Sequence, residues 1–393
     1  MSSPRFEHTH PPTRIVVGAG EARNVGAMLA ELGLRRPLVV CGATVSRGPQ
    51  LATVAAGLGE RIAAVFSEIG RHAELTTLSA GATLARKSGA DSIVSIGGGA
   101  TIDSAKFIAV LLAVEGPLEP HQVPHDREGM VAERKPLPEA TLPHIALPTT
   151  TGSSSEIMPW TGVRDPARGV KLLFSDPALI PRVAVLDPEL AAPTGPQLTA
   201  TSGATALARA IEALYSTARQ PLADAYALQA LRLLSDAVPR SIANGDDLDA
   251  RAAALIGSLM SGIAAQNAMV SVVHAVGHAV GGRYALQHGV AHAILLPRVA
   301  ARCLPAIGEQ RHALLAALGG RPSMDAAASG VEAVRVLDEL LARLPIPRRL
   351  RDAGVPETDL PVLARLVQSE PMLRSAPVAF GEDELLEVLT DAW

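Results

Sequence analysis

SIGGGATIDSAKFIAV, residues 95–110, is the stretch that decides the fold of the first half of the chain. An apolar run leads into Gly97, Gly98 and Gly99, and a helical pattern follows from Thr101. Glycines let backbone amides approach a phosphate closely, and the positive end of the following helix favours the same anion. We therefore predict a strand, a pyrophosphate-binding turn and a helix. A tight turn without a ligand is the alternative, because the stretch matches neither GxGxxG nor a Walker loop.

Two charged residues of the expected helix support a bound pyrophosphate. Asp103 and Lys106 lie near its beginning, and Lys106 is one of few lysines in a chain whose basic residues are mostly arginines. We expect both residues to contribute to the cofactor site. The alternative for Lys106 is an exposed position on the surface of the helix.

A second polar cluster, LPTTTGSSSE at residues 147–156, follows another apolar run. It places the hydroxyls of Thr149, Thr150, Ser154 and Ser155 at the carboxyl end of an expected strand. In open α/β sheets ligands bind at that edge, so we expect these hydroxyls to line the cofactor site. A plain Ser/Thr loop is the alternative.

The rest of the first half repeats the alternation of apolar runs with helical patterns. This alternation predicts a mainly parallel sheet that is covered on both faces. Strands are expected at residues 14–18, 37–41, 61–66, 91–97, 144–150 and 182–187, and helices at residues 21–34 and 75–88. Residues 115–143 are rich in proline and charge and are expected to form a long surface loop.

The second half has helical spacing and few strand signals. Helices are expected at residues 201–216, 222–238, 248–282, 289–304 and 331–344. Two prolines and a glycine in ELAAPTGPQ, residues 189–197, interrupt the pattern between the halves. The sequence therefore predicts an α/β domain over residues 1–192 and an all-α domain over residues 193–393.

The segment VVHAVGHAVGGRYALQHGVAH, residues 272–292, contains His274, His278, His288 and His292. His274 and His278 are four residues apart and share one helix face. Such a cluster suits a metal site, a general acid or base, or both. Any one of these histidines alone is more simply explained as a structural residue.

Composition excludes several classes of protein. The formal net charge of −4 and the absence of a basic stripe argue against a nucleic-acid partner. The N-terminus lacks the apolar core of a signal peptide, and the longest apolar run, residues 107–114, is too short to cross a bilayer. Cys41 and Cys303 are the only cysteines, which fits a reducing compartment. We expect a cytoplasmic protein that binds no membrane.

The motifs, in this order, resemble the iron-containing, or group III, alcohol dehydrogenase family. The matching stretches are GGGATIDSAK, LPTTTGSSSE and HAVGHAVGG with QHGVAHAILLP, and EALYS at residues 212–216 is similar to the maleylacetate reductase branch. The resemblance implies an N-terminal dinucleotide-binding α/β domain and an all-α C-terminal domain, as in dehydroquinate synthase-like proteins, with the active site between them. It also implies a homodimer and an NAD(P)H cofactor. The residues that it assigns to the cofactor are Gly97, Gly98, Gly99, Thr101, Asp103, Lys106, Thr149, Thr150, Ser154 and Ser155.

The resemblance fails at two of the four positions where the family binds its metal. The family has Asp, His, His and His there, and this chain has Thr205, Arg209, His274 and His288. A carboxylate and an imidazole are lost, and the permanent cation of Arg209 repels a divalent ion. We therefore expect no catalytic metal.

Without a metal, other groups have to stabilise the substrate oxygen. Arg209 supplies positive charge and hydrogen-bond donors, so we expect it to bind the substrate oxygen or a substrate carboxylate. His278, which the family places near the nicotinamide, is expected to relay the proton, with His274 and His288 as hydrogen-bonding partners. The alternative for Arg209 is an ion pair, for example with Glu212, across a collapsed site.

The choice of cofactor depends on the end of the second expected strand. NAD-preferring enzymes often place an acidic residue there, on the ribose hydroxyls. Here Gly42, Ala43 and Thr44 follow the strand, so we expect Gly42 at the cofactor and NADP to be accepted. Arg47 is a candidate partner of the 2′-phosphate, or else a simple loop arginine.

These observations favour an NAD(P)-dependent dehydrogenase or carbonyl reductase that acts on an alcohol, an aldehyde or an oxo acid without a metal. The substrate is then a small molecule or a modified peptide. A tailoring enzyme of a natural-product pathway, acting on a peptide threonine side chain or a phosphonate aldehyde, is an alternative. A non-redox enzyme on the same scaffold and a nucleotide-binding protein without redox activity are the others.

Overall fold

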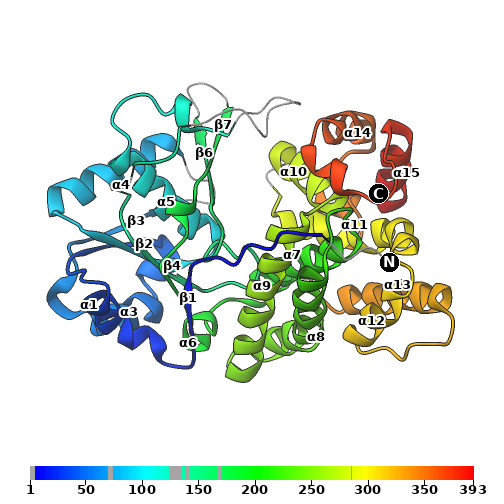
Figure 1. The fold of residues 1–393 in the computed structure, drawn as a ribbon, viewed down its shortest axis with the longest axis horizontal. Helices are drawn as coiled ribbons and strands as arrows, with labels where there is room; N and C mark the ends of the chain where they lie inside the picture. Colours follow the sequence, from blue (N-terminus) through cyan, green and yellow to red (C-terminus); the bar gives the residue numbers. More distant parts are fainter. Residues whose placement is uncertain (1–4, 70–73, 124–134, 139–140, 166–169, 285) are drawn as a thin grey trace. The chain divides into compact units, whose positions relative to one another are not determined.

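The computed structural model describes residues 5–69, 74–123, 135–138, 141–165, 170–284 and 286–393. These residues form two compact units, which are treated separately below (Figure 1). An α/β unit comprises Pro11–Thr150 and Ser154–Pro193, and a helical unit comprises residues 5–10, Thr151–Ser153 and Thr194–Trp393. The chain thus passes from one unit to the other one residue after the expected division. Residues 5–10 and the Thr151–Ser153 turn, which the sequence placed in the α/β domain, instead pack within the helical unit.

The α/β unit contains a six-stranded parallel sheet in the order β1-β8-β5-β4-β2-β3. All six expected strands are present, although the third begins later because residues 59–61 form a 3-10 turn. The expected fold class is confirmed. The strands are β1 (Arg14–Val17), β2 (Pro37–Gly42), β3 (Ala64–Ile69), β4 (Ser92–Gly97), β5 (His144–Pro148) and β8 (Val183–Leu186).

Both faces of the sheet are buried, which explains why its central strands are mostly apolar. Successive residues of β2, Leu38 and Val39, belong to different cores on opposite faces. The helices on one face are α4 (Leu75–Ser88) and α5 (Gly99–Ala113). Those on the other are η1 (Glu21–Asn24), α1 (Val25–Glu31), α3 (Pro49–Leu58) and α6 (Pro188–Ala191).

An antiparallel hairpin, β6 (Trp160–Asp165) and β7 (Val170–Ser175), is a feature that the sequence analysis missed. Val163, Leu172 and Phe174 pack into the same core as α4 and α5. The charged residues of the two strands obscure this apolar face in the sequence. The long loop expected at residues 115–143 lies partly outside the described residues, and its described part contains η3 (Glu119–His121).

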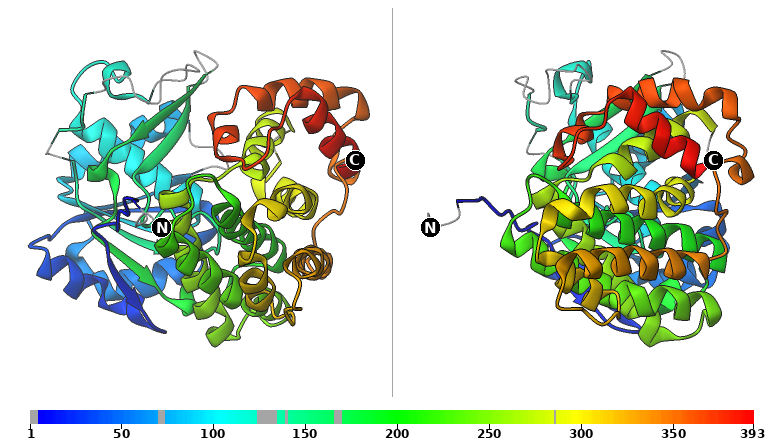
Figure 2. Two further views of the ribbon diagram at one scale, coloured as in Figure 1. Left: turned by 45° about the vertical axis from the view of Figure 1, so that its right-hand side comes forward. Right: turned by 90° about the vertical axis from the view of Figure 1, so that its right-hand side faces the viewer.

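The helical unit is built around α7 (Pro196–Tyr215), which is buried over most of its length and contacts α8, α9 and α11. Figure 2 shows its long helices, coloured green to yellow, running side by side. The other helices are α8 (Pro221–Ala243), α9 (Leu248–Ala268), α10 (Val272–Tyr284), α11 (His288–Cys303), α12 (Gln310–Ala317), α13 (Ala326–Ala342), α14 (Leu360–Gln368) and α15 (Glu382–Ala392). Of these, α12, α14 and α15 were not expected.

The single helix expected over residues 248–282 is two helices, α9 and α10, and that prediction was wrong. The chain leaves α9 at Met269, a non-glycine residue with a positive φ of 67°. No glycine or proline marks this break. Tertiary contacts hold it instead, because Ser375 donates a hydrogen bond to the Val270 carbonyl and Glu212 accepts from the first amides of α10.

Two helical segments, Leu248–Ala268 and His288–Ile307, are long and apolar enough to cross a membrane by length and composition alone. Most of each apolar window is buried inside the helical unit, 67% in the first and 72% in the second. Packing in the core of this unit accounts for their apolar character.

Candidate active site

The carboxyl ends of β2 and β4 mark the point where the strand order of the α/β unit reverses. The chain runs outward from β2 to β3 and then returns to place β4 on the other side of β2. Gly42 ends β2 and Gly97 ends β4, so the glycine turn lies at this switch point. Ligands of doubly wound sheets bind in the crevice beside such a point.

The glycine turn is packed so closely that side chains are excluded from it. A Cβ atom on Gly97 would lie 2.5 Å from Thr101 Oγ1, and one on Gly98 would lie 2.9 Å from Thr150 Oγ1. The Thr149 amide donates a hydrogen bond of 3.1 Å to the Gly97 carbonyl. The turn and the hydroxyl loop after β5 therefore form one structure, at the amino end of the 15-residue helix α5 that begins at Gly99. This arrangement fits a pyrophosphate.

Lys106 contacts the protein rather than the open side of the turn. Its side chain is fully buried, and Nζ donates hydrogen bonds of 2.7 Å to the Met158 carbonyl and 3.2 Å to the Trp160 carbonyl. Burial lowers the pKa of the ammonium to about 8, against the opposing charges of Asp103 and Glu156. These contacts join α5 to the β6–β7 hairpin. Lys106 therefore has a structural role. These contacts agree neither with the expected cofactor contact nor with the exposed alternative.

The hydroxyl loop is mostly buried and contains a strained residue. Thr149, Ser154 and Ser155 are buried, and Thr150 is half-buried. Ser154 has a φ of 54°, in the left-handed region that non-glycine residues rarely occupy. Such a conformation costs on the order of 1 kcal/mol and persists only where the surroundings enforce it. Strain of this kind is typical of ligand-binding loops.

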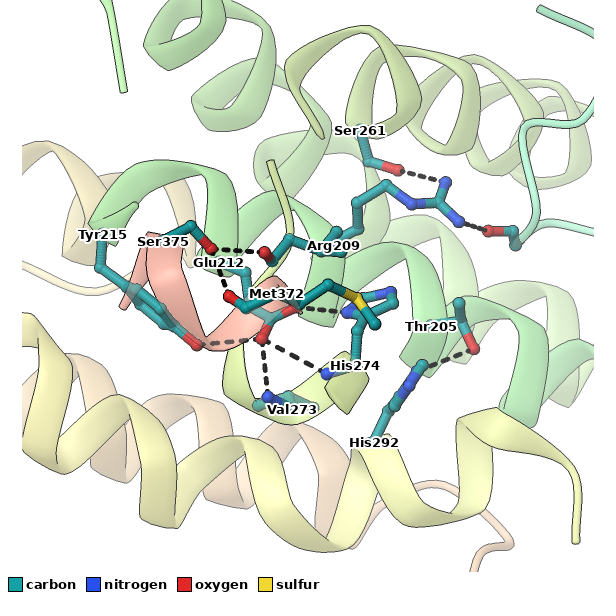
Figure 3. A network of polar contacts seen from close by, with 12 residues as sticks. Thr205, Arg209, Glu212, Tyr215, Ser261, Val273, His274, His292, Met372 and Ser375 are labelled. Carbon is teal, nitrogen blue, oxygen red and sulfur yellow. Dashed lines mark hydrogen bonds and ion pairs between the residues drawn. The ribbon is translucent and has the colours of Figure 1, made fainter. Parts of the chain in front are cut away.

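In the helical unit, a buried carboxylate orients His274 (Figure 3). Glu212 Oε1 accepts hydrogen bonds from the Val273 amide at 2.7 Å and the Tyr215 hydroxyl at 3.1 Å, and Oε2 pairs with His274 Nδ1. The carboxylate also lies at the amino end of α10, where negative charge is favoured. His274 Nε2 is buried and has no hydrogen-bond partner among the described residues.

The protonation of this pair follows from its surroundings. Burial lowers the pKa of His274 well below its usual value, and the positive charge of Arg209 lowers it further. Burial raises the pKa of Glu212 to about 7, against the hydrogen bonds of its backbone and Tyr215 donors. A neutral imidazole that donates its Nδ1 hydrogen to a carboxylate presents the lone pair of Nε2. His274 therefore offers an acceptor in a dry site.

His292 is a buried neighbour of His274 that the sequence analysis did not assign to the site. The two ring centroids are 4.3 Å apart, and His292 Nδ1 lies 3.3 Å from Thr205 Oγ1. Its Nε2 is buried, without a hydrogen-bond partner in the described structure, and a Cβ on Gly277 would lie 2.4 Å from it. The apolar residues on both sides of His292 in α11 were the available signal that it is buried.

His278 and His288 differ from this buried pair because both are exposed. Their ring centroids are 5.5 Å apart, and His278 Nδ1 lies 3.6 Å from Glu370 Oε2. The expected cluster of four histidines is thus one buried pair and one exposed pair, formed where α10 and α11 meet.

Arg209 is buried, and both of its terminal nitrogens donate to the protein. Nη2 donates a hydrogen bond of 2.6 Å to the Gly152 carbonyl, and Nη1 donates one of 3.4 Å to Ser261 Oγ. Figure 3 shows the guanidinium extended toward Ser261 while Glu212 turns toward His274. The ion pair of Glu212 is therefore with His274, not with Arg209.

The side chains around His274 and Arg209 do not form a suitable ligand set for a divalent metal ion. Thr205 Oγ1 donates to the Thr201 carbonyl at 3.2 Å and lies beside His292, where it provides no charged ligand. Arg209 contributes positive charge close enough to lower the pKa of both buried imidazoles. Within the described ranges, no three His, Cys, Asp or Glu side chains are grouped as metal binding requires.

The chain matches known proteins over nearly its whole length. The family model described as "Iron-containing alcohol dehydrogenase" matches residues 12–188, and that described as "Fe-containing alcohol dehydrogenase family, C-terminal" matches residues 199–393. The NAD-dependent methanol dehydrogenase of Bacillus methanolicus is 30% identical over 97% of this chain and 98% of its own. Maleylacetate reductase of a Rhizobium species is 32% identical over 95% of this chain and 94% of its own. The crystal structure of 1,3-propanediol oxidoreductase superposes with a TM-score of 0.91 at 29% identity, covering 99% of this chain and 100% of that one.

Proposed function

The chain belongs to the iron-containing alcohol dehydrogenase family and is an oxidoreductase of alcohols and carbonyl compounds, and we propose that it transfers hydride to or from a nicotinamide cofactor without a catalytic metal. The observation that carries this proposal is the pairing of His274 with Glu212. It leaves a buried Nε2 without a hydrogen-bond partner among the described residues, at a place where Thr205 and Arg209 disfavour an ion.

The glycine turn and the hydroxyl loop bind the cofactor in this proposal. The amides after Gly97 and the amino end of α5 hold the pyrophosphate, and Thr149, Thr150, Ser154 and Ser155 line the loop beside it. When bound, the nicotinamide supplies hydride to a carbonyl carbon or accepts hydride from an alcohol carbon.

His274 exchanges the proton of the substrate oxygen. In the oxidation direction its Nε2 lone pair takes the hydroxyl proton as the carbon–hydrogen bond breaks, and in reduction the protonated imidazole returns that proton to the oxygen. Glu212 stabilises the imidazolium through Nδ1. Four donors meet this carboxylate, so its orientation is fixed before substrate arrives.

His278 and His288 carry the proton between His274 and water. Both are exposed and lie on the two helices that also hold the buried pair, α10 and α11. His278 Nδ1 lies 3.6 Å from Glu370 Oε2, so a carboxylate stands beside this end of the relay. This gives the exposed pair the relay role that we expected of His278, with His288 as its neighbour.

The substrate in this proposal is a small aldehyde, oxo acid or the corresponding alcohol, supported by the similarity to maleylacetate reductase. NADP is accepted because no carboxylate stands at Gly42, Ala43 or Thr44 at the end of β2. Arg47 is exposed nearby, with its Nε donating to the Ala43 carbonyl at 3.1 Å, and it is the candidate contact for the 2′-phosphate.

The test is turnover by protein that has been stripped of metal with a chelator and analysed for residual iron and zinc. NADPH and NADH are each offered with a panel of aldehydes and oxo acids. Turnover by metal-free protein, unchanged when iron or zinc is added, supports the proposal. Turnover that appears only with one equivalent of metal refutes the metal-free mechanism, and tight nucleotide binding without turnover supports the nucleotide-binding alternative.

A further inference from the structure

We propose that Arg209 is a positioning residue that holds the Thr151–Ser153 turn on α7 and thereby fixes the hydroxyl loop on both sides of that turn. Its importance for cofactor binding rests on the function proposed above, whereas its effect on the loop does not. The family places a metal ligand at position 209, and in this chain the same position serves as a tether.

The contacts of the guanidinium join three segments of the helical unit (Figure 3). Arg209 on α7 donates 2.6 Å to the carbonyl of Gly152 in the turn and 3.4 Å to Ser261 Oγ on α9. Ser261 Oγ in turn donates 2.7 Å to the Ser258 carbonyl, so its lone pairs face the guanidinium. A charge-assisted hydrogen bond to a buried carbonyl is stronger than a neutral one.

A second contact attaches the Thr151–Ser153 turn to α7 at Ser202, seven residues before Arg209. The Thr151 amide donates a 3.4 Å hydrogen bond to Ser202 Oγ, and a Cβ on Gly152 would lie 2.7 Å from the Ser202 carbonyl. Ser202 and Arg209 are seven residues apart and share one face of the helix. The Thr151–Ser153 turn therefore packs directly against α7 and is hydrogen-bonded to it at Ser202 and at Arg209.

The residues next to the turn depend on this attachment. Thr150 precedes it and Ser154 follows it, and both belong to the expected cofactor loop. Ser154 has its strained φ of 54° immediately after the turn. Because strained backbone persists only where its surroundings enforce it, release of Gly152 allows Ser154 to relax and disorders the hydroxyls that line the cofactor.

The same contacts argue against our earlier expectation that Arg209 binds substrate. Arg209 is only 7% exposed, and both of its terminal nitrogens already donate to buried acceptors. A substrate oxygen would have to displace the Gly152 carbonyl. The two roles predict different measurements, because a substrate ligand leaves cofactor binding unchanged and a tether does not.

The experiment measures the Kd for NADPH and NADH in the absence of substrate, for the wild type and for Arg209→Ala, Arg209→Lys and Arg251→Ala. Arg251 is a matched control, because it is also a buried arginine of this unit and donates to Gly245, Thr199 and Thr194. We expect Arg209→Ala to raise Kd at least tenfold and Arg209→Lys, which retains a donor, to raise it less. Arg251→Ala should change Kd by less than twofold.

Hydrogen exchange of the unliganded proteins gives a second readout that does not need the cofactor. Amides of residues 149–156 should exchange faster in Arg209→Ala than in the wild type or in Arg251→Ala, and Arg209→Lys should be intermediate. Unchanged exchange in both Arg209 variants overturns the inference. So does an unchanged Kd with a raised KM for substrate, which would make Arg209 a substrate ligand. A wild type that binds neither nucleotide, combined with faster exchange, refutes the proposed function and leaves the tether supported.

Discussion

At the scale of single residues, Glu212 determines what His274 can do. The carboxylate faces two backbone amides of α10, the Tyr215 hydroxyl and the imidazole, and it is completely buried. A carboxylate that orients a histidine is a common partner of metal ligands. In this chain Glu212 pairs with His274 Nδ1, and in the proposed mechanism that pairing sets the tautomer of the base.

Glu212→Gln should lower kcat about 10- to 100-fold with little change in cofactor Kd. The amide has the same shape but carries no charge to stabilise the imidazolium of His274. Steady-state kinetics and a binding titration measure the two quantities. Tyr215→Phe is the control, because it removes one donor and keeps the carboxylate. An undiminished kcat in Glu212→Gln would reduce Glu212 to a cap of α10.

Two substitutions should restore metal binding. Thr205→Asp together with Arg209→His supplies a carboxylate and an imidazole beside His274 and removes the repelling cation. We expect about one equivalent of zinc or iron in the double variant after dialysis, and much less in the wild type and in either single variant. Elemental analysis of the purified proteins measures this. A double variant that stays free of metal would show that other residues exclude the ion.

Residue-scale reasoning from sequence located the glycine turn after β4 and the hydroxyl loop after β5, because each is marked by residue type and spacing. The assignment of residues 205 and 209 to altered metal-ligand positions stays a prediction. Sequence reasoning did not find the roles of Glu212 and His292. Glu212 was considered only as a partner for Arg209, since a sequence does not show which donors a buried carboxylate faces. Lys106 matched a motif, yet its ammonium donates to the carbonyls of Met158 and of Trp160, the first residue of a hairpin that was itself not predicted.

At the scale of elements, α7 and α11 approach each other through a glycine. A Cβ on Gly289 would lie 1.8 Å from the Thr201 carbonyl, so α11 begins in direct backbone contact with α7. Thr201 Oγ1 also donates to Gln287 Oε1 at 2.7 Å. These contacts fix the start of the helix that carries His288 and His292.

Gly289→Ala should therefore destabilise the protein by about 1–3 kcal/mol or more, because the added methyl group forces the two helices apart. Gly282→Ala in α10 is a matched control, since none of the residues that the structure describes lies within 4 Å of its added Cβ. That change should be neutral or stabilising by up to about 1 kcal/mol. Thermal unfolding of both variants compares them, and equal midpoints would contradict the close packing.

The free energy of unfolding should depend on pH through Lys106, which joins α5 to the β6–β7 hairpin. Burial lowers its pKa from 10.5 to about 8, so between these values the unfolded chain binds more protons than the folded chain. The free energy of unfolding of the wild type should then rise with pH relative to Lys106→Met, by on the order of 3 kcal/mol between pH 8 and 10.5. Unfolding midpoints measured in parallel over that range test this. Parallel curves for the two proteins would show that the ammonium is not desolvated.

The elements were predictable where their apolar pattern is continuous. The six sheet strands and the helix Leu75–Ser88 follow from periodicity alone. The break between α9 and α10 does not, because it is enforced from outside the segment by Glu212 and Ser375. The β6–β7 hairpin was missed for a similar reason, since its apolar residues are recognised only against α4 and α5.

At the scale of the whole molecule, the family assignment makes nucleotide binding the property to measure first. NADPH at about 100 times its Kd should stabilise the folded protein by about 2.7 kcal/mol, by mass action. Zinc or iron at similar concentrations should have no such effect, because the ligand set is incomplete. Differential scanning fluorimetry with each additive tests both statements. A rise in the unfolding temperature with zinc or iron, and none with NADPH, would contradict the proposal.

The short Thr151–Ser153 turn also constrains how such a gene can be recombined. The chain contributes to the helical unit three times, and the middle contribution is only these three residues. A single recombination crossover near Pro193 would combine the Thr151–Ser153 turn of one parent with residue 209 of the other parent. Hybrids of this chain with other members of the iron-containing alcohol dehydrogenase family should therefore function only when the turn and position 209 are inherited from the same parent.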